Sequence, residues 1–336
     1  MNPSADFLAQ YSALTSGVGL AELSGRTVIA VTGSDCASFL QSFTTNDIKR
    51  VKVGGGCEAF ITSPQGKTLG HVLVFGEPNQ YTLDTTPGQA PVLIAHFDKY
   101  VISEDVQFVD RSDEFRDLLV AGPKSAALLT AVSGTQPPTE LLAHAAATIA
   151  GRPAIMRRVE FAGPLSYFVQ VSAINAAEIS EAIAAAGAIC CGSAAIESAR
   201  LEVGIPLFTV DITPDNLPQE VARDARAISL TKGCYLGQET VARIDAVGHV
   251  NRLLVGVTFA STEIPASDMM LLAGDQQVGQ VTSAAFSPRL QAPLALAYVR
   301  RNQAKPGTIL SSVAGKAEVI ALPLAPSSGN LPENSP

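Results

Sequence analysis

The sequence predicts an α+β fold followed by a small all-β unit, and three observations support this. Two strand-like runs, CEAFITS and KTLGHVLVF, are joined by Pro64-Gln65-Gly66, which is typical of a β-hairpin. Helix-like and strand-like segments mix with such hairpins, which favours α+β over a doubly wound parallel sheet. From Arg252 onward, short strand-like runs alternate with Gly, Pro and Asp turns, which is typical of a small barrel or sandwich.

Apolar spacing and turn residues predict the individual elements. Helices are expected at residues 5–16, 34–43, 88–100, 123–132, 174–186 and 238–244. Ser34 is a suitable N-cap for the second helix, and Pro123 suits the start of the fourth. Strands are expected at 26–31, 57–63, 67–75, 79–85, 104–110 and 115–122, twice within 154–171, and at 253–259, 268–274, 276–286 and 293–300.

Composition excludes several classes of protein. The 336 residues are 47% hydrophobic and 16% charged, which allows a large buried core and argues against general disorder. The net charge of −8 argues against a broad nucleic-acid-binding face. The N-terminal segment has neither a basic n-region nor an apolar h-region, and no long apolar run resembles a membrane span. We therefore expect a cytoplasmic protein without direct nucleic-acid or membrane partners.

The five cysteines do not form a recognisable metal or disulfide pattern. Their number is odd, no C-x-x-C pair occurs and the four histidines are scattered, so we expect no metal site built from this chain alone. The neighbours Cys190 and Cys191 are expected to be core thiols at the edge of a strand or turn.

The stretch KGCYLGQE, from Lys232 to Glu239, places a thiol between two glycines. Gly233 and Gly237 permit sharp backbone turns on either side of Cys234. Cys234 would also lie just before a helix N-terminus and two residues from an ammonium group, and both features lower the pKa of a cysteine. Cys234 is therefore a candidate reactive or ligand-forming thiol. The alternative is a buried loop cysteine whose glycines serve only the turn.

The same stretch resembles the signature K-G-C-Y-x-G-Q-E of the YgfZ family of folate-binding proteins, which includes factors that mature or repair iron–sulfur enzymes. Three other stretches resemble both YgfZ and the related T protein of the glycine cleavage system, a tetrahydrofolate-dependent aminomethyltransferase. They are GSDCASFLQSFTTNDIKRVKVGG, SPQGKTLGHVLVF and RLEVGIPLFTVDITPDNLPQE. The resemblance covers most of residues 20–300.

This resemblance implies a T-protein-like fold around a central pocket. Two interleaved α+β subdomains, one of them ferredoxin-like, would form a folate-binding region over residues 1–248. A C-terminal β-barrel would follow over 249–324, and 325–336 would be a disordered tail. The implied cofactor is tetrahydrofolate or a one-carbon derivative of it.

The resemblance also implies folate-binding residues. Glu202, in RLEVG, matches the carboxylate that holds the pterin ring, and a carboxylate can accept two parallel hydrogen bonds from that ring. The alternative is an exposed helix-terminal glutamate paired with Arg200. Tyr81 matches an aromatic residue near the folate, and its alternative is a half-buried strand tyrosine.

Three residues of the signature complete the implied site. Lys232 would meet the glutamate tail or a carbonyl group of the folate, or would only stabilise the thiolate of Cys234. Gln238 and Arg243 are implied as further cofactor-binding residues without a defined role.

One departure from the T protein bears on the reaction. The hairpin of the T protein carries an aspartate that is essential for aminomethyl transfer, but the corresponding place here is about Gly70 and His71. An imidazole does not replace a carboxylate anion in that role. We therefore do not expect glycine-cleavage aminomethyltransferase activity, and whether the chain is an enzyme stays open.

The leading hypothesis is a folate-binding accessory factor that supports the assembly or repair of iron–sulfur enzymes, and thereby indirectly tRNA modification. Its partners would be folate and iron–sulfur client or assembly proteins, with Cys234 as the functional thiol. The alternative is a folate-dependent one-carbon or aminomethyl transferase, or a demethylase, with Cys234 as nucleophile. A third hypothesis is a folate-binding regulator without chemistry.

Overall fold

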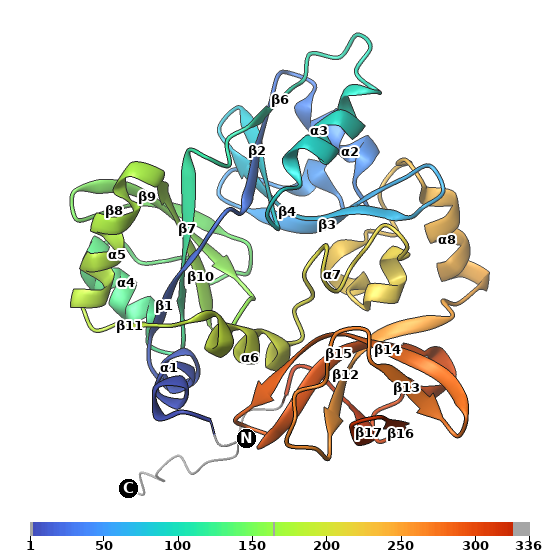
Figure 1. The fold of residues 1–336 in the computed structure, drawn as a ribbon. Helices are drawn as coiled ribbons and strands as arrows, with labels where there is room; N and C mark the ends of the chain where they lie inside the picture. Colours follow the sequence, from blue (N-terminus) through green and yellow to red (C-terminus); the bar gives the residue numbers. More distant parts are fainter. Residues whose placement is uncertain (1–2, 164, 325–336) are drawn as a thin grey trace, which may run out of the picture.

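The computed structural model describes residues 3–163 and 165–324, which form two sheet-and-helix units and a barrel (Figure 1). The first unit contains a five-stranded sheet in the order β3 (Gly56–Thr62), β4 (Thr68–Glu77), β5 (Gln80–Thr85), β2 (Thr27–Thr32) and β6 (Gln107–Asp110). All neighbouring strands in it are antiparallel. The predicted hairpin is the pair β3 and β4.

The two faces of the first sheet have different partners. Helices α2 (Cys36–Phe43) and α3 (Ala90–Asp98) cover one face, where Ala59 and Val74 join an apolar core. Side chains alternate between faces along a strand. Phe60 and Phe75 therefore point away from these helices and pack against other parts of the chain.

The second unit is a six-stranded sheet. Its order is β11 (Ile189–Cys190), β1 (Gly19–Leu23), β7 (Phe115–Ala121), β10 (Ser166–Ser172), β9 (Arg152–Val159) and β8 (His144–Ile149). Helices α4 (Ser125–Ser133) and α5 (Ala176–Ala185) cover one face, and α1 (Ala5–Ser16) and α6 (Ser193–Val203) lie against residues of the other. The oxygen of Ser4 accepts a hydrogen bond from the backbone N–H of Phe7, so Ser4 caps α1.

The third unit is a closed six-stranded barrel. Its strands are β12 (Arg252–Phe259), β15 (Ala292–Arg300), β14 (Gln276–Ser287), β13 (Met270–Ala273), β16 (Ile309–Ser312) and β17 (Gly315–Ile320). Inward-facing residues such as Val257, Leu271 and Val299 fill it. Closure leaves no unpaired strand edge. The predicted α+β fold with a C-terminal barrel is confirmed.

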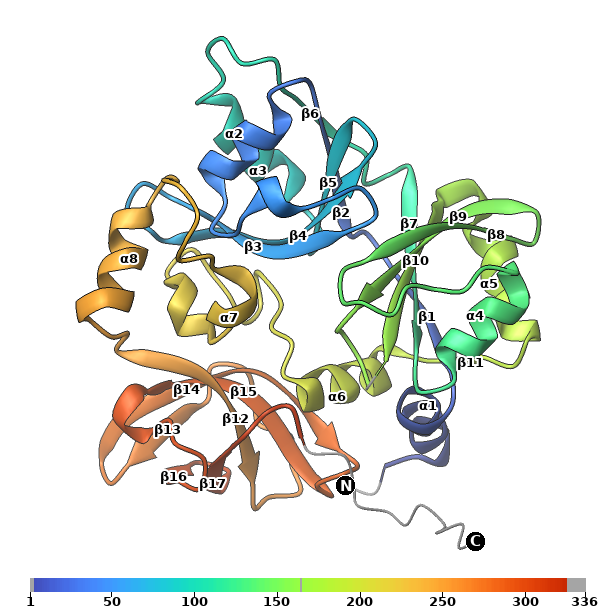
Figure 2. The same ribbon diagram turned by 180° about the vertical axis from the view of Figure 1, so that it is seen from behind.

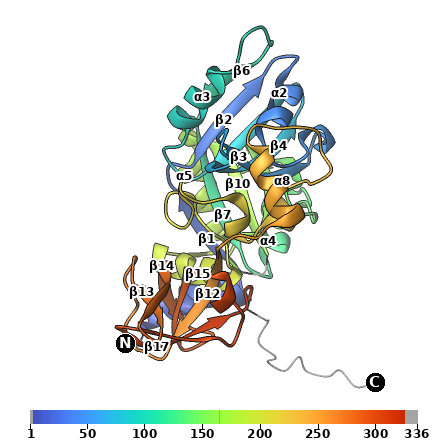
Figure 3. The same ribbon diagram turned by 90° about the vertical axis from the view of Figure 1, so that its right-hand side faces the viewer.

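Short helices connect the units. The turn η3 (Pro218–Val221), α7 (Asp224–Ala227) and α8 (Gln238–Val247) lie between the β3–β4 hairpin and the barrel (Figure 2). Seen from the side, the first unit and the barrel stand at opposite ends of the molecule (Figure 3). Three further turns are η1 (Ile48–Arg50), η2 (Ala173–Asn175) and η4 (Arg301–Gln303).

Several local expectations need correction. Strands β1, β8, β11, β16 and β17 and the helices α6 and α7 were not predicted. The hydroxyl of Ser34 donates to Asp105, and Asp35 is the residue that precedes α2. Cys190 is exposed rather than buried, because β11 is a two-residue strand at the sheet edge. The predicted disordered tail at 325–336 lies outside the described residues. Within 3–163 and 165–324, no helix is long and apolar enough to cross a membrane.

Candidate functional site

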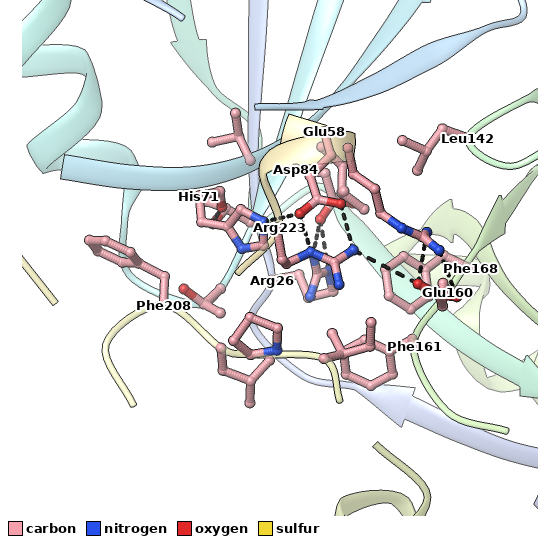
Figure 4. Close-up of a pocket in the computed structure, with 18 of the residues that line it drawn as sticks. Arg26, Glu58, His71, Asp84, Leu142, Glu160, Phe161, Phe168, Phe208 and Arg223 are labelled. Atoms are coloured by element: carbon pink, nitrogen blue, oxygen red, sulfur yellow. Dashed lines mark hydrogen bonds and ion pairs between the residues drawn. The ribbon is translucent and has the colours of Figure 1, made fainter. Parts of the chain in front are cut away.

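A cavity lies where the first and second units face the segment that follows α6 (Figure 4). Three aromatic side chains contribute to its wall, namely Phe161, Phe168 and Phe208. The charged and titratable residues of the wall are Arg26, Glu58, His71, Asp84, Glu160, Arg223 and Arg226. A concave site that combines apolar walls with a few convergent polar groups is typical of small-molecule binding.

The hairpin places Glu58 and His71 on the cavity side of the first sheet. Glu58 lies two residues before Phe60 in β3, so both side chains leave the sheet on the same face. Phe60 pairs with His71 across the strands, and the two rings stack with centroids 5.0 Å apart. His71 Nε2 lies 2.6 Å from Glu58 Oε1. The hairpin thus presents a joined imidazole and carboxylate to the cavity.

Arg223 holds the carboxylate of Glu58 from the opposite side. Its Nη2 donates to Glu58 Oε2 at 2.6 Å, and its Nε donates to Oε1. Burial raises the pKa of Glu58, but the hydrogen bonds from Arg223 and His71 outweigh it and lower the pKa to about 2. Glu58 is therefore ionised at neutral pH.

A second buried network forms the wall between the two sheets. The Nε of Arg26 donates to Asp84 Oδ1 at 2.8 Å, and Nη1 of Arg157 lies 3.3 Å from Oδ2 of the same carboxylate. Arg26 also lies over the ring of Phe168, 4.7 Å from its centroid. Burial and the nearby charge of Asp84 raise the pKa of Asp117 well above its ordinary value. Two arginines thus offset the charge of two carboxylates at this junction.

Glu202 lies in a different buried cluster. Its carboxylate accepts hydrogen bonds from Tyr11 Oη at 2.7 Å and Ser287 Oγ at 2.5 Å, and Arg289 Nε lies 3.6 Å away. Glu202 is neither exposed nor paired with Arg200, as its alternative supposed, and it is not among the residues that line the cavity. Its folate contact stays a prediction that would require the carboxylate to exchange these partners.

Lys232 anchors the cysteine motif to the end of α2. Its Nζ donates to the backbone carbonyls of Gln41, Thr44 and Asn46 at 2.6, 2.5 and 2.9 Å. An ammonium has three donors, so all are used, and a cation is favoured at a helix C-terminus. Burial lowers the pKa of Lys232 to about 8. The structure therefore gives Lys232 an anchoring role, and its folate contact stays a prediction.

Cys234 is exposed and lies in a firmly held loop. The N–H of Leu236 donates to the carbonyl of Ser42, and the Leu236 carbonyl accepts a hydrogen bond from Thr62 Oγ1. Gly237 has φ 83° and lies against the turn of the β3–β4 hairpin. The thiol is thus accessible at an edge of the first unit, but Cys234 is not among the residues that line the cavity. A cavity shared by this thiol and a folate stays a prediction.

The three other predicted site residues also lie away from the cavity wall. Tyr81 is a half-buried tyrosine of β5 that packs against the core beneath α2 and α3, where burial raises its pKa. Gln238 is half-buried in the first turn of α8, and Arg243 is exposed on the same helix. The cofactor role of all three stays a prediction.

Sequence reasoning missed Glu58, Arg223 and Arg26. The signal for Glu58 was present, because a charged residue interrupts the apolar strand GCEAFIT. A buried charge in a strand requires a partner. Arg223 gave no comparable signal, since 165 positions separate it from Glu58.

Two family models match the chain, one over the two sheet-and-helix units and one over the barrel. The model of the GCVT N-terminal domain matches residues 4–232, and that of the glycine cleavage T-protein C-terminal barrel domain matches residues 252–325. The chain belongs to the glycine cleavage T-protein family. Within that family, the predicted YgfZ assignment is not confirmed.

Relatives with curated names are similar over nearly the whole chain. The aminomethyltransferase of Streptomyces coelicolor is 29% identical over 328 residues, covering 94% of this chain and 88% of the relative. That of Thermus thermophilus is 27% identical over 316 residues, covering 93% and 88%. The crystal structure of the glycine cleavage system aminomethyltransferase T from Bartonella henselae superposes with a TM-score of 0.84 at 22% identity, covering 95% and 89%, and shows the shared fold. The names of the Streptomyces coelicolor and Thermus thermophilus relatives favour the transferase alternative over the iron–sulfur hypothesis.

Gly237→Ala is expected to lower the free energy of unfolding by about 1–3 kcal/mol. Its positive φ disfavours a side chain, and an added Cβ would overlap the carbonyl oxygen of Ser63. Urea denaturation measures the change. Gly233→Ala is the matched control within the same motif, because a Cβ there meets no atom within 4 Å. Equal losses in both variants would contradict the close-contact explanation.

Acid should remove the stability that Glu58 provides. Its pKa is lowered from 4.5 to about 2 in the folded state, so its contribution is complete above about pH 4.5 and is lost as the pH falls toward 2. The full loss is on the order of 3 kcal/mol. Urea denaturation at pH 5 and pH 3 should show a smaller loss in Glu58→Gln than in the wild type.

Glu181→Gln is the control for this comparison, because Glu181 is exposed on α5. It should keep the wild-type dependence on pH. A Glu58→Gln protein with that same dependence would show that the carboxylate is not held as described.

Proposed function

We propose that the chain binds a reduced folate in the central cavity and takes part in folate-dependent one-carbon transfer, as its named relatives are aminomethyltransferases. The observation that carries this proposal is the cavity itself, in which a hydrogen-bonded imidazole, carboxylate and guanidinium face aromatic side chains.

The residues of the cavity suit the chemistry of a folate. The flat pteridine ring can pack on the rings of Phe161, Phe168 or Phe208, and its polar edge can exchange hydrogen bonds with charged groups of the wall. Arg226 leaves 41% of its side chain exposed and is suited to the carboxylates of the glutamate tail. Bound tetrahydrofolate would supply the nitrogen atoms that carry a one-carbon unit, and the protein would orient it and exclude water.

Glu58 supplies a carboxylate close to the hairpin position at which the T protein has its essential aspartate. Positions 70 and 71 hold no carboxylate, yet the neighbouring strand places one 2.6 Å from the imidazole of His71. The cavity therefore contains an ionised carboxylate next to the hairpin position, which supports the transferase proposal. Arg223 forms an ion pair with the Glu58 carboxylate. The negative charge of Glu58 is therefore more strongly neutralised than that of an unpaired aspartate.

A second candidate function is the folate-binding accessory factor for iron–sulfur enzymes, with an indirect effect on tRNA modification. The exposed thiol of Cys234 favours it, because the motif holds this thiol at the surface, where a partner protein can reach it. Three other thiols are less suited to react with a partner, because burial disfavours their thiolate forms. Burial raises the pKa of Cys36, and it raises the pKa of Cys57 to about 12 and that of Cys191 to about 11.

Arg226→Ala is expected to weaken tetrahydrofolate binding about tenfold, because one charge-assisted contact to the tail is lost. Anaerobic titration calorimetry measures the affinity. Arg301→Ala, at an exposed arginine beyond the last residues of β15, is the control and should bind as the wild type does. Wild-type protein that binds no tetrahydrofolate would refute the proposed function.

The same titration with Glu202→Gln decides the sequence-based assignment of Glu202. Lower affinity at unchanged stability would support the pterin contact. Unchanged affinity at lower stability would assign Glu202 to the junction of α1, α6 and the barrel.

Cys234→Ser tests the second candidate function. If the exposed thiol serves iron–sulfur enzymes, this variant should fail to rescue the activity of an iron–sulfur enzyme in cells that lack the chain, while Cys190→Ser, at the other exposed cysteine, should rescue it. Enzyme activity in extracts is the measurement. Full rescue by Cys234→Ser would eliminate the thiol-dependent function and leave the folate proposal intact.

A further inference from the structure

The two nitrogens of the His71 ring have different surroundings. Nε2 is joined to Glu58 at 2.6 Å, whereas Nδ1 has no hydrogen-bond partner among residues 3–163 and 165–324. The side chain lines the cavity and keeps 12% of its surface exposed. One nitrogen is thus held by the protein, and the other is left for a ligand.

Two direct contacts fix the orientation of the ring, and a third residue supports one of them. Phe60 stacks on one face of it, Glu58 holds Nε2, and two hydrogen bonds from Arg223 hold Glu58 in turn. Because the Glu58 carboxylate is ionised, it accepts a hydrogen bond and selects the ring form that carries a proton on Nε2. In the neutral ring, Nδ1 then bears the lone pair.

The other charged side chains of the cavity wall are paired with groups of opposite charge. Arg223 and Arg226 share Glu160, with Arg226 Nη1 at 2.8 Å and Arg223 Nη2 at 3.8 Å from Oε2. Arg26 is paired with Asp84 in the opposite wall. Each of these carboxylates therefore has an arginine partner in the wall.

We propose that His71 contacts the folate and exchanges a proton with it through Nδ1, and that Glu58 and Arg223 are the residues that position His71. This inference rests on the proposed function. The neutral ring accepts a hydrogen bond or a proton at Nδ1, the protonated ring donates there, and Nε2 stays bonded to Glu58 in both forms. The contact at Nδ1 therefore contributes to the affinity for tetrahydrofolate.

Histidine-selective ¹H–¹⁵N spectra test the contact directly, because the chain has only four histidines. His71→Gln identifies the His71 signals by their loss. Saturation of the wild-type protein with tetrahydrofolate should shift the Nδ1 resonance of His71. The exposed His249, outside the cavity wall, should not respond and serves as an internal control.

Two substitutions separate ligand contact from a structural role. A Gln side chain can reach the position of Nε2 and keep the bond to Glu58, whereas Asn can only imitate Nδ1. His71→Gln should fold with wild-type stability and bind tetrahydrofolate about tenfold more weakly, because Gln has no polar atom at the position of Nδ1. His71→Asn should lose stability and keep part of the affinity.

The outcomes distinguish this inference from the proposed function. If tetrahydrofolate binds but the His71 resonances do not move, the inference is wrong and the folate proposal survives. If His71→Gln binds tetrahydrofolate with the wild-type affinity, the inference is also wrong. If the wild type binds no tetrahydrofolate, the proposed function fails and the role of His71 fails with it.

Discussion

The ion pair between Glu58 and Arg223 is the interaction on which the candidate site depends. It joins β3 of the first unit to the segment between η3 and α7, and it fixes the carboxylate that orients His71. Both side chains are largely buried, and burying two charges costs several kcal/mol per ion before their attraction offsets the cost. Replacing such a pair by apolar residues of similar volume is often neutral, whereas removing the charge of one partner is costly. The value of the pair here lies in fixing one geometry.

The two faces of the first sheet have different roles. One face carries the apolar core beneath α2 and α3, and the other faces the rest of the molecule. Because strand side chains alternate, a single hairpin supplies both a core and a functional wall. The Cys234 motif uses this hairpin from its turn end, where Gly237 lies against it while Lys232 closes the end of α2. The same two strands therefore support both the cavity and the loop of Cys234, although the thiol does not line the cavity.

The sequence was informative where structure is local and much less so where it depends on distant contacts. Periodicity located α1, the β3–β4 hairpin and most of the barrel, because each is specified by neighbouring residues. It missed the strand β1, whose partners β7 and β11 lie far along the chain. For the site, the family resemblance drew attention to Lys232 and Glu202, which prove to be buried and hydrogen-bonded to other parts of the chain. Glu58 could have been suspected from its apolar strand, but its pairing with Arg223 is created only by folding.

The path of the chain between the two sheets has a consequence for synthesis. The strands β2 to β6 follow one another within residues 27–110, so the first sheet can assemble as soon as that stretch has left the ribosome. Strand β1 precedes them but must wait for β7, about a hundred residues later. During translation, β1 therefore emerges early and stays unpaired while the first sheet beside it is already folded. A nascent chain from which the first 110 residues have just emerged from the ribosome would be the species most exposed to chaperone capture.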